Sequence, residues 1–326
     1  MPSSAGRDAV PGRDDADAAG RLRATEAVFL VNPASANGAT AKRWPKLRLR
    51  AAELGLSGDE LLSERPGHLT ELARSVASDG RLVVVVGGDG TLNEVANGLA
   101  GTGAELAVLP NGTGQDFGRT HGIPTRFDDA VEIALRGVTR SVDVGSVTFR
   151  GPGGAEASRI FVNVGSAGMS GAVARRANSM SKALGGRVTF YYALVREFLT
   201  WKNTEVTVGL DEGERRGHMH DVILANGRWH GGGMKLAPDA LPDDGLFDVV
   251  LIGDVNKVDF VTTSPKLYSG KHVAHPKIDV VRSSVVTIDA AEPLPLELDG
   301  EQSGTTPARF EVLRGALRVR SGDPVH

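Results

Sequence analysis

The sequence contains no cysteine among its 326 residues. Disulfides, thiolate metal sites and cysteine nucleophiles are therefore excluded, which is compatible with a reducing cytoplasm. No stretch approaches the ~18 consecutive apolar residues of a membrane-spanning helix, so we expect any membrane contact to be peripheral. The formal net charge is only -3, which makes nucleic acid a poor partner for the chain as a whole.

The first part of the chain alternates short apolar runs with helix-like patterns, which indicates a parallel sheet covered by helices. Predicted strands are 27–31, 61–62, 82–86 and 106–109, and predicted helices are 42–54, 67–78 and 91–99. From about residue 139, strand patterns dominate, at 206–210, 222–225, 247–252 and 285–288, with helical interruptions at 171–201 and 257–268. We predict a disordered tail at 1–24, an α/β domain at 25–139, a mainly antiparallel β-sandwich or distorted barrel at 140–321, and a tail at 322–326.

The strongest functional signal lies where the most apolar strand meets a helix. Four valines run into Gly87-Gly88-Asp89-Gly90-Thr91, and a helix opens directly afterwards. Glycines allow backbone N–H groups to close on phosphate oxygens, and the helix N-terminus adds unpaired donors. A carboxylate among such amides is useful if a cation bridges it to phosphate, so Asp89 is a candidate catalytic residue. The alternative is a tight strand–helix turn in which Asp89 caps the helix.

Two further loops follow predicted strands and should lie at the same edge of the sheet, because ligands bind at the carboxyl ends of parallel strands. One is the glycine-rich segment 109–119, in which Thr113 can donate to a phosphate and Arg119 can balance charge. The other is the turn-rich segment 32–38. Together with the loop around Asp89, they predict a phosphate-binding face.

These three loops, in this order, resemble the diacylglycerol kinase catalytic domain, a family that includes bacterial soluble lipid kinases and, more distantly, sphingosine and ceramide kinases. The resemblance continues through Asp143, 241–247 and 298–301, and so covers nearly the whole chain beyond the tail. It implies a nucleotide-binding domain similar to phosphofructokinase and NAD kinase, followed by a β-sandwich lipid domain. It also implies ATP and Mg²⁺ as cofactors. Nucleotide contacts would fall on Asn32, Pro33, Ala34, Ser35, Ala36, Ser63, Gly88, Asp89, Gly90, Thr91, Leu92, Asn93, Glu94 and Thr113.

The sequence departs from the family pattern at three places. Ser63 stands where the family more often has threonine, which keeps the hydroxyl. The usual Gly-Thr-x-Asn-Asp run has Gln115 as its fourth residue, which puts local contacts there in doubt. The chain also stops soon after Arg320, so we expect the segment with which relatives return to the first domain to be short or missing.

The resemblance assigns further roles in the second domain. Asp244 would bind Mg²⁺ through its side chain, and Leu241 and Leu246 would do so through backbone oxygens, a ligand set that suits this ion. The alternative is an acidic turn before a strand. Glu301 would be the base that accepts the hydroxyl proton, with Asp299 and Asp143 in its network. Asp299 followed by glycine is also simply a common hairpin turn.

Two other features are open to two interpretations. His218 and His220 would share one face of a strand and could form a metal-binding pair. Because no third metal ligand is nearby, we expect them to be exposed histidines or histidines at the rim of the core. The region from Arg175 to Lys202 combines basic residues with an apolar, aromatic second half. It is either a surface that docks on anionic lipid headgroups or a helix packed on the sandwich with solvated arginines. The residues in question are Arg175, Arg176, Lys182, Arg187, Phe190, Tyr191, Tyr192, Arg196, Phe198, Trp201 and Lys202.

The predicted function is an ATP- and Mg²⁺-dependent lipid kinase that phosphorylates diacylglycerol to phosphatidic acid at the inner face of the membrane. Phosphatidylglycerol or a sphingoid base is the alternative acceptor, and a homodimer is left open. Kinases of soluble substrates share the glycine-rich motif around Asp89, but the loop at Thr113 and the Asp-Gly-Glu run ending at Glu301 argue against them. A catalytically silent lipid-binding protein is a different class, and intact Asp89, Asp244 and Glu301 argue against it.

Overall fold

The first domain is a parallel sheet with helices on both faces. The computed structural model describes residues 25–112, 114–180 and 186–323, and only the backbone of 186–191. Strands β1 (Thr25–Val31), β2 (Leu56–Leu62), β3 (Leu82–Gly87) and β4 (Glu105–Pro110) pair in the order β2-β1-β3-β4. Every residue of β3 is buried, as expected for a central strand covered on both sides.

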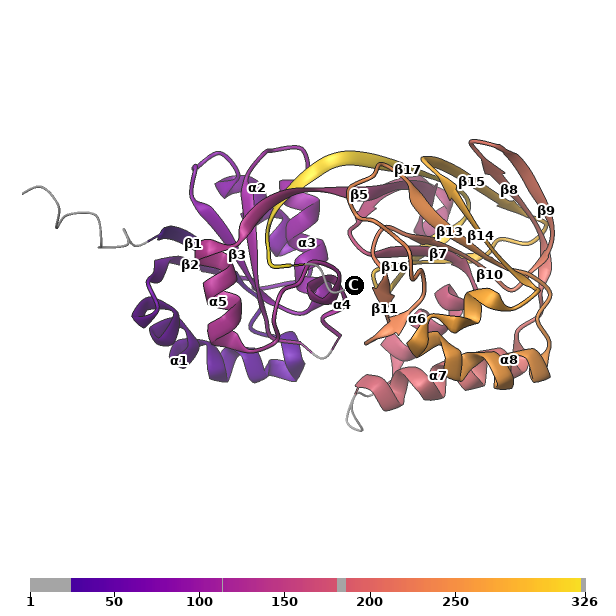
Figure 1. Cartoon of the computed structure of the whole chain (residues 1–326), viewed down its shortest axis with the longest axis horizontal. Coiled ribbons are helices and arrows are strands. Elements are labelled where there is room, and N and C mark those ends of the chain that lie inside the picture. The colour runs from indigo at the N-terminus through magenta and orange to yellow at the C-terminus, as the bar shows by residue number, and fades with distance from the viewer. Residues whose placement is uncertain (1–24, 113, 181–185, 324–326) are drawn as a thin grey trace, which may run out of the picture.

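Each face of this sheet has its own helices (Figure 1). Helices α1 (Ala39–Glu53) and α5 (Phe127–Arg136) pack on one face, where Trp44 and Val131 join the buried core. Helices α2 (His68–Val76) and α3 (Asp89–Leu99) pack on the other face through Leu69 and Val95. The sequence predicted three of these helices to within a few residues at each end, whereas α5 was missed.

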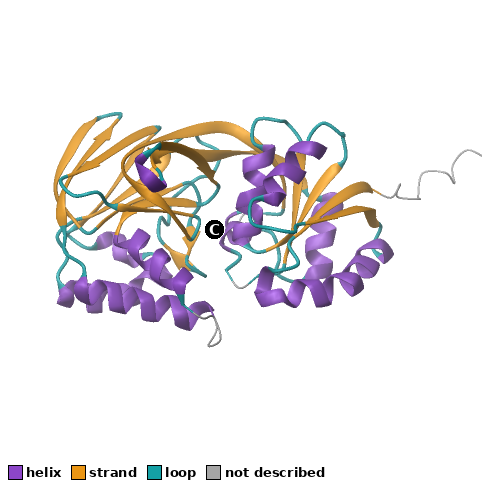
Figure 2. Cartoon of the chain, turned by 180° about the vertical axis from the view of Figure 1, so that it is seen from behind, coloured by secondary structure: helices purple, strands orange, loops and turns teal. Residues whose placement is uncertain are grey.

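The second domain is built almost entirely from antiparallel strand pairs (Figure 2), and its buried core contains several phenylalanines among aliphatic side chains. Its ring contacts include Phe161 stacked on Phe247, with Phe310 edge-on to Phe161. The strands are β5 (Val138–Arg150), β6 (Glu156–Phe161), β7 (Val164–Gly168), β8 (Thr204–Leu210), β9 (Gly213–Met219), β10 (Asp221–Ala225), β13 (Phe247–Ile252), β14 (Ile278–Ser283), β15 (Val285–Ala290), β16 (Pro295–Leu298) and β17 (Glu301–Ser321). A separate hairpin joins β11 (Trp229–His230) to β12 (Met234–Lys235). The predicted fold class is confirmed.

Helices cover one side of the second domain. They are α6 (Met169–Ser179), α7 (Gly186–Thr200) and α8 (Lys257–Thr263), the last followed by 3₁₀ segments at Ser264–Ser269 and Lys271–Ala274. Phe198 of α7 stacks on Phe260 of α8, which places these two helices side by side. No helix in the described ranges is long and apolar enough to cross a membrane.

Two long strands, β5 and β17, join the domains. They pair with each other along most of their length, and both run from one domain to the other (Figure 1). At its far end β17 pairs in parallel with β4, where Arg318 is opposite Glu105 and Val319 opposite Leu106. The expectation of a short or missing return to the first domain was therefore wrong. β17 is 21 residues long, so it pairs with β15 and β16 in the second domain and still reaches β4 in the first.

Candidate active site

A cleft of about 450 Å³ lies between the two domains, at the edge where β1, β3 and β4 end. All three predicted loops contribute to its first-domain wall. Of the predicted nucleotide contacts, those that line it are Asn32, Ser35, Ala36, Gly88, Asp89, Gly90, Thr91 and Glu94. The opposite wall includes the turn Asp299-Gly300-Glu301 of the second domain. The structure thus brings the glycine-rich loops and the predicted base to one space.

Asp89 joins the first glycine-rich loop to the second. Its carboxylate accepts hydrogen bonds from the backbone N–H groups of Gln115 (2.8 Å), Asp116 (3.1 Å) and Phe117 (3.5 Å), at the start of α4 (Asp116–Thr120). A side chain at Gly114 would collide with this carboxylate, so glycine is needed there. Burial, followed by the charge of Asp116, raises the pKa of Asp89 to about 6. Asp89 caps α4, the helix of the second loop, rather than its own helix.

The loop after β1 is held to the same wall by side-chain hydrogen bonds. Asn32 Nδ2 donates to Thr91 Oγ1 (3.2 Å), and Asn111 Nδ2 donates to Thr40 Oγ1 (2.9 Å). Within this loop Ala36 and Asn37 both have left-handed backbone angles, with φ of 53° and 56°. Non-glycine residues in this region cost energy, and such strain is often found at ligand sites.

The remaining predicted nucleotide contacts are placed differently. The cleft lining does not include Pro33, Ala34 or Ser63. Ser63 does lie at the same edge of the sheet, since it follows β2 and its N–H donates to the Val31 carbonyl at the end of β1 (2.9 Å). The Leu92 side chain lies in the hydrophobic core. Asn93 is buried and bridges the domains, as described next. Thr113 lies outside the described residues.

Asp299 sits in a turn whose position is fixed by four donors. Its Oδ1 accepts from the N–H groups of Asn163 (2.9 Å) and Val164 (3.0 Å), and its Oδ2 accepts from Val162 N–H (2.7 Å) and Asn93 Nδ2 (2.8 Å). Burial raises the pKa of Asp299, while these donors oppose that rise. Because Asn93 belongs to α3, this carboxylate also ties the second domain to the glycine-rich loop of the first.

Glu301 is two residues further on and is much more accessible. Its side chain is 55% exposed and pairs with Arg159, whose Nη2 lies 3.2 Å from Glu301 Oε2. The same guanidinium reaches Asn93 Oδ1 at 3.4 Å. Glu301 therefore faces the cleft, where the predicted base would have to lie, and its carboxylate is paired with one cation.

The predicted metal loop lies apart from the residues that line the cleft. Asp143, expected near Glu301, instead accepts from the N–H groups of Gly245 and Gly315 (2.7 Å each), so its placement in the Glu301 network was wrong. Asp244 accepts from Leu246 N–H (3.0 Å) and forms an ion pair with Arg282.

The donor types of this loop suit Mg²⁺, with one carboxylate and the main-chain oxygens of Leu241 and Leu246. However, the Arg282 guanidinium already lies against the Asp244 carboxylate, and the two cations would compete for it. The described residues contain no cluster of three or more histidine or acidic side chains able to hold a metal ion. Asp244 would have to leave Arg282 to bind a metal ion, and the assignment of Leu241, Asp244 and Leu246 stays a prediction.

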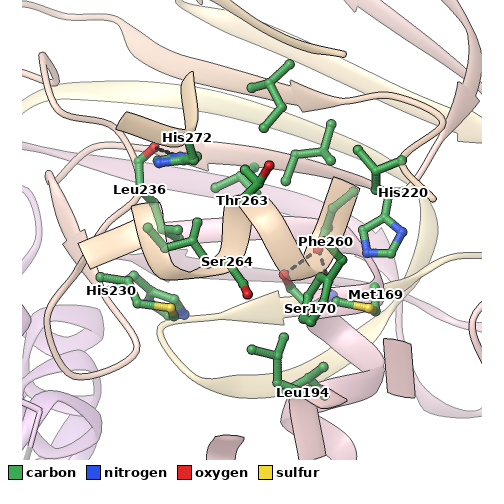
Figure 3. A pocket seen from close by; sticks show the side chains of 18 of the residues that line it. Met169, Ser170, Leu194, His220, His230, Leu236, Phe260, Thr263, Ser264 and His272 are labelled. Atoms are coloured by element: carbon green, nitrogen blue, oxygen red, sulfur yellow. Dashed lines mark hydrogen bonds between the residues drawn. The ribbon is translucent and has the colours of Figure 1, made fainter. Parts of the chain in front are cut away.

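An apolar pocket of about 110 Å³ lies beneath α7 and α8 in the second domain (Figure 3). Its wall is formed mainly by aliphatic, methionine and aromatic side chains, among them Met169, Leu194, Leu236 and Phe260. Ala174, His230 and Gly300 line both this pocket and the cleft, so the two cavities adjoin at the turn that carries Glu301.

The two paired histidines have opposite surroundings, so the expectation that they share one face was wrong. His218 is exposed, whereas His220 lines the apolar pocket and packs its ring against Phe198. Burial lowers the pKa of His220 to about 4.

The basic segment 175–202 is packed on the sandwich at some residues and exposed at others. Arg176 pairs with Glu197, and Phe198 is buried in the helical layer. Arg175, Tyr192 and Arg196 are exposed. Lys182 lies outside the described residues, as do the side chains of Arg187, Phe190 and Tyr191.

Sequence reasoning missed several residues at the junction of the two cavities. His230, Glu297 and Arg159 come from separate strands; Glu297 lies two residues before the Asp-Gly-Glu run, whereas His230 and Arg159 belong to no recognisable local motif. The one available signal was Gly231-Gly232-Gly233, which directly follows His230.

Comparisons with known proteins agree with this architecture. The family described as "Diacylglycerol kinase catalytic domain" matches residues 26–147, and that described as "YegS C-terminal NAD kinase beta sandwich-like domain" matches residues 163–321. A diacylglycerol kinase of Staphylococcus carnosus is 29% identical over 294 residues, covering 89% of this chain and 93% of that protein. One from Bacillus subtilis is 28% identical over 296 residues, covering 89% and 94%.

A solved structure from Bacillus anthracis superposes with a TM-score of 0.73 at 25% identity and covers 94% of this chain and 100% of its own. Both halves of the chain match the two domains of one kind of enzyme, and the curated relatives extend over both. The chain belongs to the diacylglycerol kinase catalytic-domain family and is a lipid kinase.

Proposed function

We propose that the protein transfers the γ-phosphoryl group of ATP to the hydroxyl of diacylglycerol, giving phosphatidic acid and ADP. The observation that carries this proposal is the meeting of two cavities at one turn. The polar cleft is lined by the glycine-rich loops, the apolar pocket is lined by aliphatic side chains, and Gly300 lines both. A lipid whose chains enter the pocket would present its hydroxyl near Glu301.

The chain's own residues supply the main parts of such a reaction. Backbone N–H groups around Gly88 and Gly90 would bind phosphate oxygens at the N-terminus of α3. Glu301 would take the proton of the lipid hydroxyl. The hydroxyl oxygen would form a bond to the γ-phosphorus, while the bond between that phosphorus and ADP breaks. Arg159, 3.2 Å from Glu301, would offset negative charge nearby. Mg²⁺ bound to the nucleotide would neutralise phosphate charge.

The size of the pocket bears on how the lipid enters. At about 110 Å³ it is smaller than the ~150 Å³ cavity that admits benzene. A long acyl chain would therefore fit only if the covering helices α7 and α8 separate or if most of the chain stays in the bilayer.

The test is incubation with labelled ATP and mixed micelles that contain diacylglycerol, phosphatidylglycerol or sphingosine. We expect label in phosphatidic acid, and Glu301→Gln should remove most of it. Glu311→Gln is the matched control, since Glu311 is an exposed glutamate on the same strand, beside Arg309. If phosphatidylglycerol or sphingosine is labelled instead, that lipid is the acceptor in place of diacylglycerol. If none of the three lipids is labelled, the proposal is refuted.

We also propose that the helical layer of the second domain contacts anionic membrane surfaces. Large apolar side chains are exposed on it, namely Tyr192 and Leu199 on α7, Val258 and Val261 on α8, and Tyr268. Lys257, Lys266 and Lys271 lie on the same segments. Exposed apolar residues among basic ones suit the headgroup region, and the apolar pocket lies directly beneath.

Sedimentation with anionic vesicles tests this placement. Binding should weaken as salt rises, because exposed charges are screened within ~10 Å at 0.1 M salt. Val258→Gln combined with Val261→Gln should reduce binding, whereas Leu49→Gln, an equally exposed change on α1 of the first domain, should not. If the double variant binds vesicles as well as Leu49→Gln does, the membrane contact lies on another surface of the protein.

A further inference from the structure

His230 stands between the polar cleft and the apolar pocket and lines both of them. Figure 3 shows its place in the wall of the apolar pocket. Its side chain is only 12% exposed, and its Nε2 lies 3.3 Å from Oε1 of Glu297, which is almost fully buried. The two residues come from different strands, β11 and β16, so the pair is a product of the tertiary fold.

The backbone holds His230 in place from both sides. Asn163 Nδ2 donates to the Trp229 carbonyl, and Gly232 N–H donates to Asp116 Oδ2 at 2.7 Å. Gly231, Gly232 and Gly233 all have positive φ, which other residues adopt only with strain. Since Asp116 belongs to α4, this tight turn fixes the imidazole relative to the glycine-rich loops as well.

Glu297 connects His230 to the turn that carries Glu301. Its Oε2 accepts from Ser166 Oγ (3.0 Å), and its Oε1 accepts from Gly300 N–H as well as facing His230. Gly300 directly precedes Glu301. Any loss of the His230 contact would leave a buried carboxylate with one partner fewer and would loosen the hydrogen bond that sets the direction of Glu301.

The charges around His230 favour its protonated form. Burial by itself lowers the pKa of His230. Four nearby acids raise this pKa by more than burial lowers it, so the net shift is upward; they are Glu297 on β16, Asp116 on α4, Asp299 in the turn and Asp89 on α3. Arg119, packed beside Gly233, is engaged by Asp116. A cation at this point offsets the negative charge of several acids that must stay close together in the cleft.

We propose that His230 and Glu297 form a positioning pair that sets Glu301 and the polar head of the acceptor lipid at the junction of the two cavities. The pair does not exchange a proton with substrate. The His230 imidazolium pairs with the Glu297 carboxylate, and this carboxylate accepts a hydrogen bond from Gly300 N–H. Through these two contacts the pair positions Glu301, the next residue in the chain. The reaction that it serves is the lipid phosphorylation proposed above.

Kinetics of His230→Gln and His230→Leu test the pair. Gln keeps a donor near the position of Nε2 but no charge, and Leu keeps neither. We expect kcat to fall about tenfold for Gln and up to about a hundredfold for Leu, the usual cost of a small misplacement at a reacting centre. KM for ATP should change by less than about twofold. His218→Gln, at an exposed histidine, is the matched control.

The pH profile separates positioning from simple structural support. If the imidazolium is required, wild-type kcat should decline as pH rises through the raised pKa of His230, and this basic limb should vanish in His230→Gln. A basic limb that persists in the Gln variant, or a kcat equal to wild type, overturns the inference.

Two outcomes keep the inference distinct from the proposed function. If wild-type protein phosphorylates no lipid, the proposed function fails first. If wild type is active and the Gln variant matches it in rate and pH profile, the positioning role fails alone. Should the Leu variant not fold, His230→Gln and Glu297→Gln decide the question, and Glu297→Gln should show the same fall in kcat with KM for ATP unchanged.

Discussion

Replacing Asp299 by asparagine should destabilise the protein strongly, because the substitution keeps shape and removes acceptors. All four contacts of Asp299 are N–H donors, two to each carboxylate oxygen. An asparagine has one oxygen and one NH₂ group, so either orientation points the NH₂ group at two donors. The backbone should tolerate the change, because Asp299 has a φ of 47° and asparagine accepts left-handed angles.

The magnitude follows from the two donors that lose their acceptor. Each buried unsatisfied group costs about 1–3 kcal/mol, so the loss in the free energy of unfolding should be roughly 2–6 kcal/mol. Urea denaturation at neutral pH measures it, with Asp289→Asn, an exposed aspartate on β15, as the control. A change of less than about 0.5 kcal/mol for Asp299→Asn would refute the reasoning, since it would mean that the four donors do not depend on the charge.

Three further measurements address the cleft and the buried acids. Thermal-shift titration should show stabilisation by ATP, since a ligand that binds only the native state raises its stability, and no shift at millimolar nucleotide would contradict the assignment of the cleft. Asp89→Asn and Glu301→Gln should each lower turnover about a hundredfold in the labelled-ATP assay, and a variant near the wild-type rate would lose its assigned role. Burial raises the pKa of Asp221 from 3.8 to about 7, so the folded state retains a proton that the unfolded chain releases. Stability should therefore fall as pH rises from about 4 to 7, and Asp221→Asn should flatten this dependence in thermal melts.

The sequence allowed prediction of those features that local pattern determines. The valine run before Gly87, the three loops after strands and the change of pattern near residue 139 all depend on neighbours in the chain. They were sufficient for the fold class and for the wall of the cleft formed by the first domain. The register of β17 against β4 was not predictable, because Arg318 and Glu105 are paired only by the completed fold.

Partners of buried side chains were the main failure of sequence reasoning. Asp89 was expected to meet a bridging cation or to cap its own helix; it lines the cleft as the first expectation requires, but the helix that it caps begins 27 residues later. Asp143 was expected beside Glu301, but it binds backbone N–H groups of Gly245 and Gly315. A carboxylate in a loop accepts hydrogen bonds from backbone N–H groups that the tertiary fold leaves without another acceptor. The local sequence does not identify these N–H groups, because they come from distant parts of the chain.

The engagement of most other acids around the cleft supports the proposal that Glu301 takes the proton. Asp89 accepts three backbone N–H groups, Asp299 accepts four donors, and Asp116 binds Arg119 and Gly232. Glu297 is shared by His230, Ser166 and Gly300. A proton placed on any of these oxygens would displace a donor in a buried site, whereas a base must gain and release a proton at every turnover. Glu301 is half exposed, faces the cleft and is held by a single cation, so a reaction at its carboxylate would disturb few buried contacts.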